Sequence, residues 1–158
     1  MSRLLAIGAT VILAGCGFHL QNAITVPPLM ERTYVDAIDE YSLFYRELGQ
    51  ELRAAGVELV DSPEQATAIL SILADRTDQR VLSVSARNVP TEYEVYYTVE
   101  YTITAGQRVL LSSQDVTLTR DYTYDTTLVL GKEREEAMLR EALVNDLVRI
   151  VLKQISSL

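Results

Sequence analysis

The chain has 158 residues, of which 48% are hydrophobic, and a formal net charge of −8 at pH 7. This length is enough for one compact domain with a hydrophobic core, and we do not expect a second domain. The acidic balance disfavours any broad attraction to nucleic acid or to an anionic membrane face, so an anionic ligand would need a local basic cluster.

The N-terminus has the parts of a bacterial export signal. A positive start with Arg3 is followed by an apolar run over residues 4–13 and by the small residues Ala14 and Gly15 before Cys16. The run is too short for a transmembrane helix, which needs about 20 apolar residues. The pattern resembles the lipobox of bacterial lipoproteins, in which the signal is removed and the cysteine becomes an acylated first residue.

We therefore expect residues 1–15 to be a signal peptide and Cys16, the one cysteine of the chain, to carry lipid. Several acyl chains would anchor the protein firmly, whereas one chain gives only marginal membrane binding. The alternative for a lone cysteine, a buried apolar side chain, is weaker because Cys16 closes the signal where the motif requires it. Gly17, not aspartate, follows, and the resemblance to Gram-negative lipoproteins then implies sorting to the outer membrane, facing the periplasm.

A tether, a strand and a helix are predicted next. Residues 16–30 lack periodicity and contain two prolines, so we interpret them as an acylated tether before a single domain over residues 31–158. A short strand is predicted over residues 33–38. A helix should begin after Ser42, a suitable N-cap, and end at Gly56, with one apolar face formed by Phe44, Leu48 and Leu52.

The middle of the chain alternates between turns and β-type segments. Residues 57–60 are expected to be extended, and Ser62 with Pro63 should open one short helical turn. Residues 67–74 are predicted as a strand. Because β-type character resumes over residues 81–86 after a polar interval, one long bulged strand or two short strands would fit.

The clearest pattern is a hairpin after a turn at residues 87–90. Residues 93–104 alternate between apolar and polar side chains, as in a half-buried antiparallel strand whose charged face is solvated or partnered. A second turn leads to a partner strand over residues 109–122. From Lys132 onward, a wide apolar stripe predicts a long helix that covers the sheet. The expected fold is α+β, with two helices packed on one face of a mostly antiparallel or mixed sheet of about four strands.

Catalytic chemistry is poorly supported. The single histidine, His19, lies three residues after Cys16, so a hydrolytic triad or a multi-histidine zinc site has no imidazole in the folded part. Acidic pairs such as Glu92 and Glu94 are more often a solvated strand face than an acid and base. We expect no catalytic residue, no metal and no cofactor.

Nine tyrosines in a chain without tryptophan suggest a partner surface. Tyr96, Tyr122 and Tyr124 are placed on the outer face or near loops, and amphipathic rings are enriched at interfaces. The alternative is that these tyrosines are ordinary strand-forming residues.

Basic residues are few, so their positions matter. Arg87 lies in the turn before the long strand, Arg120 ends the partner strand, and Lys132 opens the last helix, where a cation is electrostatically unfavourable. An anionic phosphate would explain these positions, because lysine, arginine and helix N–H groups all favour it. Solubility is the alternative explanation.

Four segments together resemble the LptE family of lipopolysaccharide-assembly lipoproteins over essentially the whole chain. They are Cys16 to Leu20 after the signal, Gly56 to Leu59 after the first helix, Thr91 to Val95 at the start of the long strand, and the terminal helix. The Cys-Gly-aromatic-His-Leu start is the most specific of them.

The resemblance implies a non-catalytic lipoprotein that plugs the LptD β-barrel in the outer membrane, assists its assembly and contacts lipopolysaccharide. By position, Arg87 and Lys132 match the family's basic residues, while Thr117 stands where some relatives have a third cation, so Arg120 is a candidate replacement. Two other classes stay open: an accessory lipoprotein of another envelope transport system, and an envelope hydrolase, which would need a pocket of titratable groups.

Overall fold

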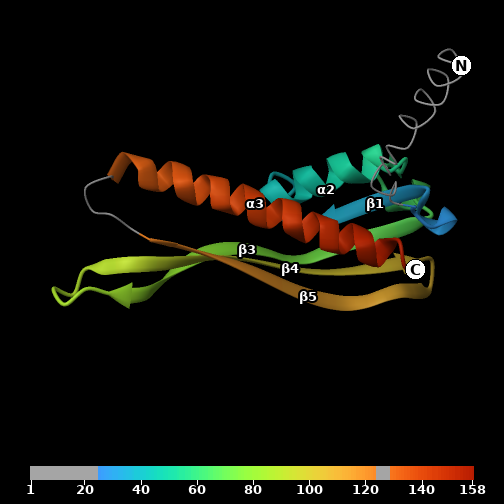
Figure 1. Ribbon diagram of the computed structural model, residues 1–158. Helices are drawn as coiled ribbons and strands as arrows, with labels where there is room; N and C mark the ends of the chain where they lie inside the picture. The colour runs from blue at the N-terminus through green and yellow to red at the C-terminus, as the bar shows by residue number, and fades with distance from the viewer. Residues whose placement is uncertain (1–24, 124–128) are drawn as a thin grey trace, which may run out of the picture.

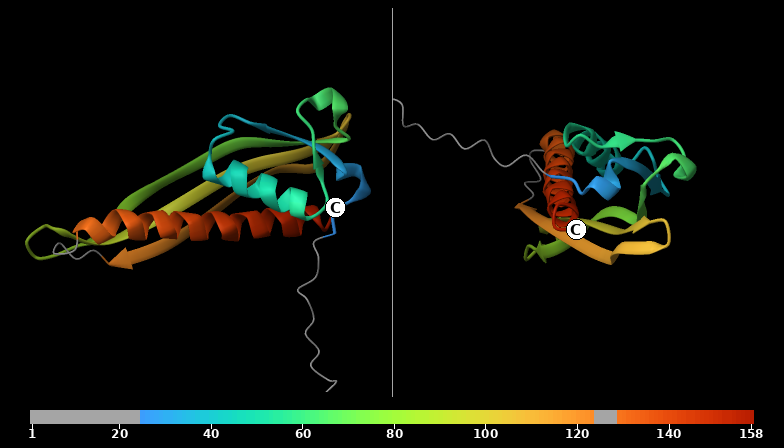
Figure 2. Two further views of the ribbon diagram at one scale, coloured as in Figure 1. Left: turned by 90° about the horizontal axis from the view of Figure 1, so that it is seen from above. Right: turned by 90° about the vertical axis from the view of Figure 1, so that its right-hand side faces the viewer.

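The computed structural model describes residues 25–123 and 129–158 as two layers, a twisted sheet with two helices on one of its faces (Figures 1 and 2). The strand order is β2-β1-β3-β4-β5. β1 pairs in parallel with β2 and β3, and β3, β4 and β5 form an antiparallel meander. The elements are β1 (Arg32–Ala37), α2 (Leu43–Ala54), β2 (Glu58–Leu59), β3 (Ala68–Val84), β4 (Pro90–Ala105), β5 (Arg108–Thr123) and α3 (Val129–Ile155), with 3-10 turns at Pro28–Met30 and Pro63–Gln65.

The predicted α+β class and the helices on one face are confirmed. The sheet has five strands and not about four, because the two-residue strand β2 adds a short edge beside β1. The segment over residues 57–60 was expected to be extended, and its pairing with β1 makes part of it a strand.

The helix α2 forms where its caps and its apolar spacing predict it. The Ser42 hydroxyl oxygen accepts a hydrogen bond from the Tyr45 backbone N–H at 3.0 Å, which satisfies one of the free donors of the first turn. Gly56 has a φ of +89°, a conformation that favours glycine, and it ends the helix. The buried face includes Phe44 and Leu48, which dock the helix on the sheet.

The long strand β3 resolves the choice between one bulged strand and two short ones in favour of one. Its register with β4 shifts between Ile72 and Ala74 and again near Ser83, yet the ladder continues through the polar interval. β1 pairs with β3 only as far as Ile72. Beyond Ile72, β3 pairs with β4 alone, while β5 accompanies β4 as far as Glu92, so that only the tip of the β3–β4 hairpin extends beyond the other strands (Figure 1).

The core lies between the sheet and the two helices. The alternation in β4 is confirmed, because Val95, Tyr97, Val99, Tyr101 and Ile103 are all buried. They face the apolar stripe of α3, which has 27 residues and is about 40 Å long. Burial raises the pKa of Tyr101 to about 12, and its hydroxyl donates a hydrogen bond to Gln154 of α3.

The packed part of the chain includes Met30, at the end of the segment expected to be a tether. Its side chain is fully buried, and its carbonyl oxygen accepts a hydrogen bond from the Thr33 hydroxyl at 2.8 Å. In the part of the chain that the structure describes, no helix is both long and apolar enough to cross a membrane.

Candidate functional site

The face of the sheet opposite the helices, here called the outer face, is covered by no other element among the described residues (Figures 1 and 2). The register places one alternating set of side chains from three strands on this face, so that it is polar across its width. The set from β3 to β5 includes Arg76, Asp78, Arg80, Glu92, Glu94, Tyr96, Thr98, Glu100, Asp115, Thr117, Thr119 and Asp121.

An ion pair joins β3 to β4 on the outer face. Arg80 donates to both carboxylate oxygens of Glu94, with N–O distances of 2.9 and 3.0 Å from the same guanidinium nitrogen. The guanidinium carbon lies 6.0 Å from the centre of the Tyr96 ring. The Glu94 side chain is only 9% exposed, whereas that of Arg80 is 64% exposed, so the arginine covers the carboxylate.

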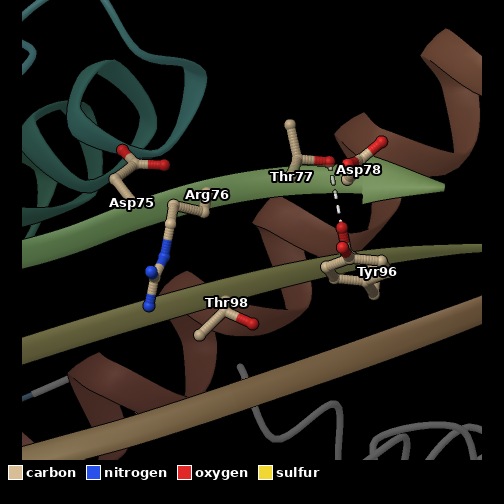
Figure 3. Close-up of a pocket in the computed structure, with 6 residues that line it drawn as sticks. All are labelled: Asp75, Arg76, Thr77, Asp78, Tyr96 and Thr98. Atoms are coloured by element: carbon tan, nitrogen blue, oxygen red, sulfur yellow. Dashed lines mark hydrogen bonds between the residues drawn. The ribbon is translucent and has the colours of Figure 1, made fainter.

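Two hollows that share Tyr96 and Thr98 lie near this ion pair. The first, of about 670 Å³, is lined by Asp75, Arg76, Thr77, Asp78, Tyr96 and Thr98 (Figure 3). The second, of about 390 Å³, also has Tyr96 and Thr98 in its wall and reaches Thr117 and Thr119 of β5. The hydroxyls of Thr98 and Thr117 are hydrogen-bonded to each other at 2.8 Å. The two hollows offer hydroxyl, carboxylate and guanidinium groups to a polar partner.

The three tyrosines predicted at an interface have different environments. Tyr96 lies on the outer face and lines both hollows, as expected. Tyr122 was expected on the outer face or near a loop and at a partner interface, but it is buried: the residue is 6% exposed, its ring stacks on Tyr93 at 5.5 Å, and its hydroxyl donates to Gln79 at 2.9 Å. The cause is register, since Tyr122 pairs with Tyr93 on the face that the helices cover. Tyr124 lies outside the described residues.

Two of the three candidate cations lie at the same end of the molecule. Arg87 is exposed in the tight turn between β3 and β4, where Asn88 adopts a φ of +58°. Figures 1 and 2 show the tip of this hairpin at the end of the molecule where α3 begins, and Lys132 is the fourth residue of α3. The side chain of Lys132 is outside the described part of the structure, as is Cys16.

The third candidate cation, Arg120, is directed to the helix face and not to the hairpin tip. It pairs in register with Val95 and donates to the Asp146 carboxylate of α3 at 2.6 Å. Val95 is five residues from Pro90, so Arg120 lies about 17 Å along the sheet from the base of the turn. Hydrogen bonds from Arg120 and Arg149 lower the pKa of Asp146. Arg120 thus holds α3 on β5.

The ion pair of Arg80 and Glu94 is the feature of this site that sequence reasoning missed. Each residue lies seven positions from Arg87, one before and one after, so the predicted turn already implied that they could pair across the hairpin. Among the described residues, no group of three or more histidine, cysteine, aspartate or glutamate side chains is placed to hold a metal ion. What the outer face offers is hydrogen bonding and charge.

Comparison with known families identifies this arrangement. The model of the LptE family, described as lipopolysaccharide-assembly, matches residues 30–155, which include every helix and strand from β1 to α3. The chain belongs to the LptE family. The match extends across both layers of the fold and contains the outer face and the hairpin tip.

Relatives agree with this assignment. The chain is 28% identical to the LPS-assembly lipoprotein LptE of Yersinia enterocolitica over 84% of its own length and 64% of that protein. It is 27% identical to the LPS-assembly lipoprotein LptE of Pectobacterium atrosepticum over 84% of its length and 72% of that protein. The chain therefore spans less than two thirds of the Yersinia relative.

Solved structures share the fold. Lipoprotein B from Nitrosomonas europaea superposes with a TM-score of 0.75 at 26% identity, over 87% of this chain and 88% of that one. The rare lipoprotein B from Shewanella oneidensis has a TM-score of 0.70 at 24% identity, over 80% and 94% of the two chains. The two-layer fold of this LptE-family chain is thus that of other lipoproteins.

Proposed function

We propose that this chain is an outer-membrane lipoprotein that plugs the LptD β-barrel, assists its assembly and takes part in lipopolysaccharide transport, with direct lipopolysaccharide contact. The family match over residues 30–155 is the observation that carries this proposal. Cys16 supplies the anchor through its acyl chains, and the folded domain acts through shape and contact, without catalysis.

The outer face supports the plug. The interior of an outer-membrane barrel is polar, so a protein that fills it needs hydrogen-bonding groups on its surface. Tyr96 and the threonines of β4 and β5 present such groups on a face that no helix covers. The buried apolar side chains of the sheet pack against α2 and α3, which keeps the domain folded while its outer face is free to contact the barrel wall.

The hairpin tip and the start of α3 support lipopolysaccharide contact. Arg87 and Lys132 come from elements that lie at the same end of the molecule, and a pair of cations there suits the phosphates of lipid A or the core sugars (Figures 1 and 2). The negative net charge of the chain makes such a local site necessary. Arg120 contributes little, because Asp146 already engages it.

A photocrosslinking experiment tests the plug. With p-azidophenylalanine at position 96 in cells, we expect a crosslink to a large β-barrel, because Tyr96 lies open on the outer face. The same group at position 122 is the control, since Tyr122 is buried and should not reach a partner. Equal crosslinking from both positions, or none from position 96, would count against a plug that uses this face.

A charge-reversal experiment tests lipopolysaccharide contact. Arg87→Glu combined with Lys132→Glu should weaken the salt-sensitive binding of lipopolysaccharide to the purified protein by about tenfold or more. This is the loss expected when one or two charge-assisted hydrogen bonds are removed. The control is Arg108→Glu with Lys153→Glu, which changes net charge equally at the end of the molecule where β4 meets β5 and α3 ends. Equal binding by the two variants would remove Arg87 and Lys132 from the account.

A further inference from the structure

The tip of the β3–β4 hairpin carries an exposed aliphatic cluster beside Arg87. The cluster, here called the aliphatic tip, consists of Val81, Leu82, Val84 and Val89, which are 39% to 53% exposed. The ten residues from Val81 to Pro90 contain no carboxylate, although the chain has 22 aspartates and glutamates. A segment that is apolar and cationic within an acidic protein is suited to a ligand that is apolar and anionic.

The aliphatic tip is held in one shape. The Ser85 N–H donates to the Val89 carbonyl at 2.8 Å, and the Asn88 N–H donates to the Ser85 carbonyl at 2.9 Å. Just below, the hydroxyls of Ser83 and Thr91 lie 2.8 Å apart and join the two strands. A preorganised turn loses little conformational entropy when it binds a ligand.

The tip also stands apart from the covered part of the sheet. The ladder of β4 with β5 ends at Glu92, so the last pair of the hairpin, Val84 with Pro90, has no third strand beside it. Figures 1 and 2 show the hairpin projecting at this end. The four aliphatic side chains are therefore exposed at the end of the hairpin that carries Arg87. Val81 lies in register with Tyr93 of the helix-covered face, and Leu82 lies beside Glu92 and Asp121 of the outer face.

We infer that the aliphatic tip binds acyl chains of lipopolysaccharide while Arg87 binds a phosphate of the same molecule. This inference rests on the proposed lipopolysaccharide contact and adds the part of the ligand that each group takes. Lipid A joins phosphates to several acyl chains within one molecule, and the tip joins a guanidinium to four aliphatic side chains within nine residues. Apolar contact at the tip shields the acyl chains from water while a lipopolysaccharide molecule separates from other lipopolysaccharide molecules.

A phospholipid surface is the competing source of the same chemistry, and the net charge disfavours it. A membrane presents many anionic headgroups to the whole domain of a chain whose net charge is −8, whereas one lipopolysaccharide molecule meets only the tip. The tip is therefore expected to bind the lipid molecule and not an anionic bilayer.

The test uses the full chain reconstituted in phosphatidylcholine nanodiscs, with empty discs as the blank. Binding of lipopolysaccharide, of lipopolysaccharide stripped of its acyl chains, and of phosphatidylglycerol vesicles is measured for three variants. Val81→Thr with Val84→Thr makes the tip polar while keeping β-branched side chains. Ile38→Thr with Val109→Thr is the matched control at exposed positions outside the tip. Ala86→Leu enlarges the apolar surface at an exposed position of the tip.

The tip double variant should bind intact lipopolysaccharide about tenfold more weakly, as expected for two lost methyl contacts. Its binding to the deacylated form and its unfolding midpoint should not change. Ala86→Leu should bind intact lipopolysaccharide more tightly, and the Ile38 and Val109 variant should match the wild type.

Four outcomes would overturn the inference. If intact and deacylated forms are affected equally, the tip contacts only the sugar or phosphate part. If phosphatidylglycerol vesicles bind, and Val81→Thr with Val84→Thr weakens that binding as much as it weakens lipopolysaccharide binding, the tip is a membrane contact. If wild-type protein binds lipopolysaccharide and neither the double variant nor Ala86→Leu changes it, the inference fails and the proposed function stands. If wild-type protein does not bind lipopolysaccharide at all, both fail.

Discussion

Arg80→Ala should destabilise the domain by about 2 kcal/mol, although the Arg80 side chain is largely exposed. The reason is its partner: the Glu94 carboxylate is 9% exposed and accepts three N–H contacts at 2.9 to 3.3 Å from Arg80. Breaking a fully buried pair costs about 3–5 kcal/mol and a surface pair about 0–1 kcal/mol. A pair with one buried and one exposed member lies between these limits.

A double-mutant cycle isolates this effect. Glu94→Gln keeps the shape of the side chain and removes its charge, so it should cost about 1 kcal/mol. The combined Arg80→Ala and Glu94→Gln variant should cost less than the sum, with a coupling of about 1 kcal/mol. Urea unfolding of a fragment over residues 25–158 measures all three values, and the slope with denaturant shows whether the unfolded state changes as well.

Arg76→Ala is the matched control, because Arg76 lies on the same strand and face and makes no ion pair with any residue that the structure describes. It should change stability by less than about 0.5 kcal/mol. If Arg80→Ala behaves like Arg76→Ala, and the cycle shows additive costs, then solvent screens the Glu94 carboxylate and the burial argument is refuted.

Three further stability predictions follow from single side chains. Leu147→Ala should cost about 2–5 kcal/mol in urea unfolding, because Leu147 is fully buried, and a smaller loss would show that α3 collapses onto the space. The pKa of Asp146 is lowered in the folded state, so its hydrogen bond with Arg120 stabilises the fold at pH values above the carboxyl pKa of the unfolded chain, about 4. This contribution is lost as the pH falls through the folded-state pKa. Asp146→Asn should therefore flatten the acid limb of a stability–pH curve, and an unchanged limb would contradict this reasoning. Gly56→Ala should cost about 1 kcal/mol, because Gly56 has a positive φ. Gly49→Ala should stabilise α2 by about 0.5–1 kcal/mol, because Gly49 lies inside the helix and the new methyl group would meet only ordinary contacts at 3.5 Å or more. Thermal melts in which Gly56→Ala is the more stable variant would contradict this backbone argument.

Local patterns predicted most of the fold. The alternation of residues 93–104 needed no tertiary information, because a strand with one buried face repeats every two residues. The spacing of Phe44 and Leu48 with the Ser42 cap was equally sufficient for α2. The short strand β2 escaped prediction because two residues carry no period, and its pairing with β1 depends on where α2 returns the chain.

The site was less accessible to sequence reasoning, because it depends on register across three strands. Tyr122 was placed by its nearness to a loop, while its true position follows from pairing with Tyr93 under α3. Arg120 donates a hydrogen bond to Asp146, which lies 26 residues further along the chain in α3. No local sequence pattern specifies the angle at which this helix docks on the sheet, so the contact could not be predicted. Arg87 could be placed from the sequence alone, because Asn88 and Pro90 mark a turn at this point of the chain.

The central claim is that this LptE-family lipoprotein works inside an LptD barrel, and co-purification from native outer membranes tests it most directly. The full-length chain, tagged at its C-terminus and extracted in mild detergent, should bring down LptD as one large β-barrel in a fixed ratio. Recovery of the tagged chain alone, or with the components of a different envelope transport system, would contradict the claim.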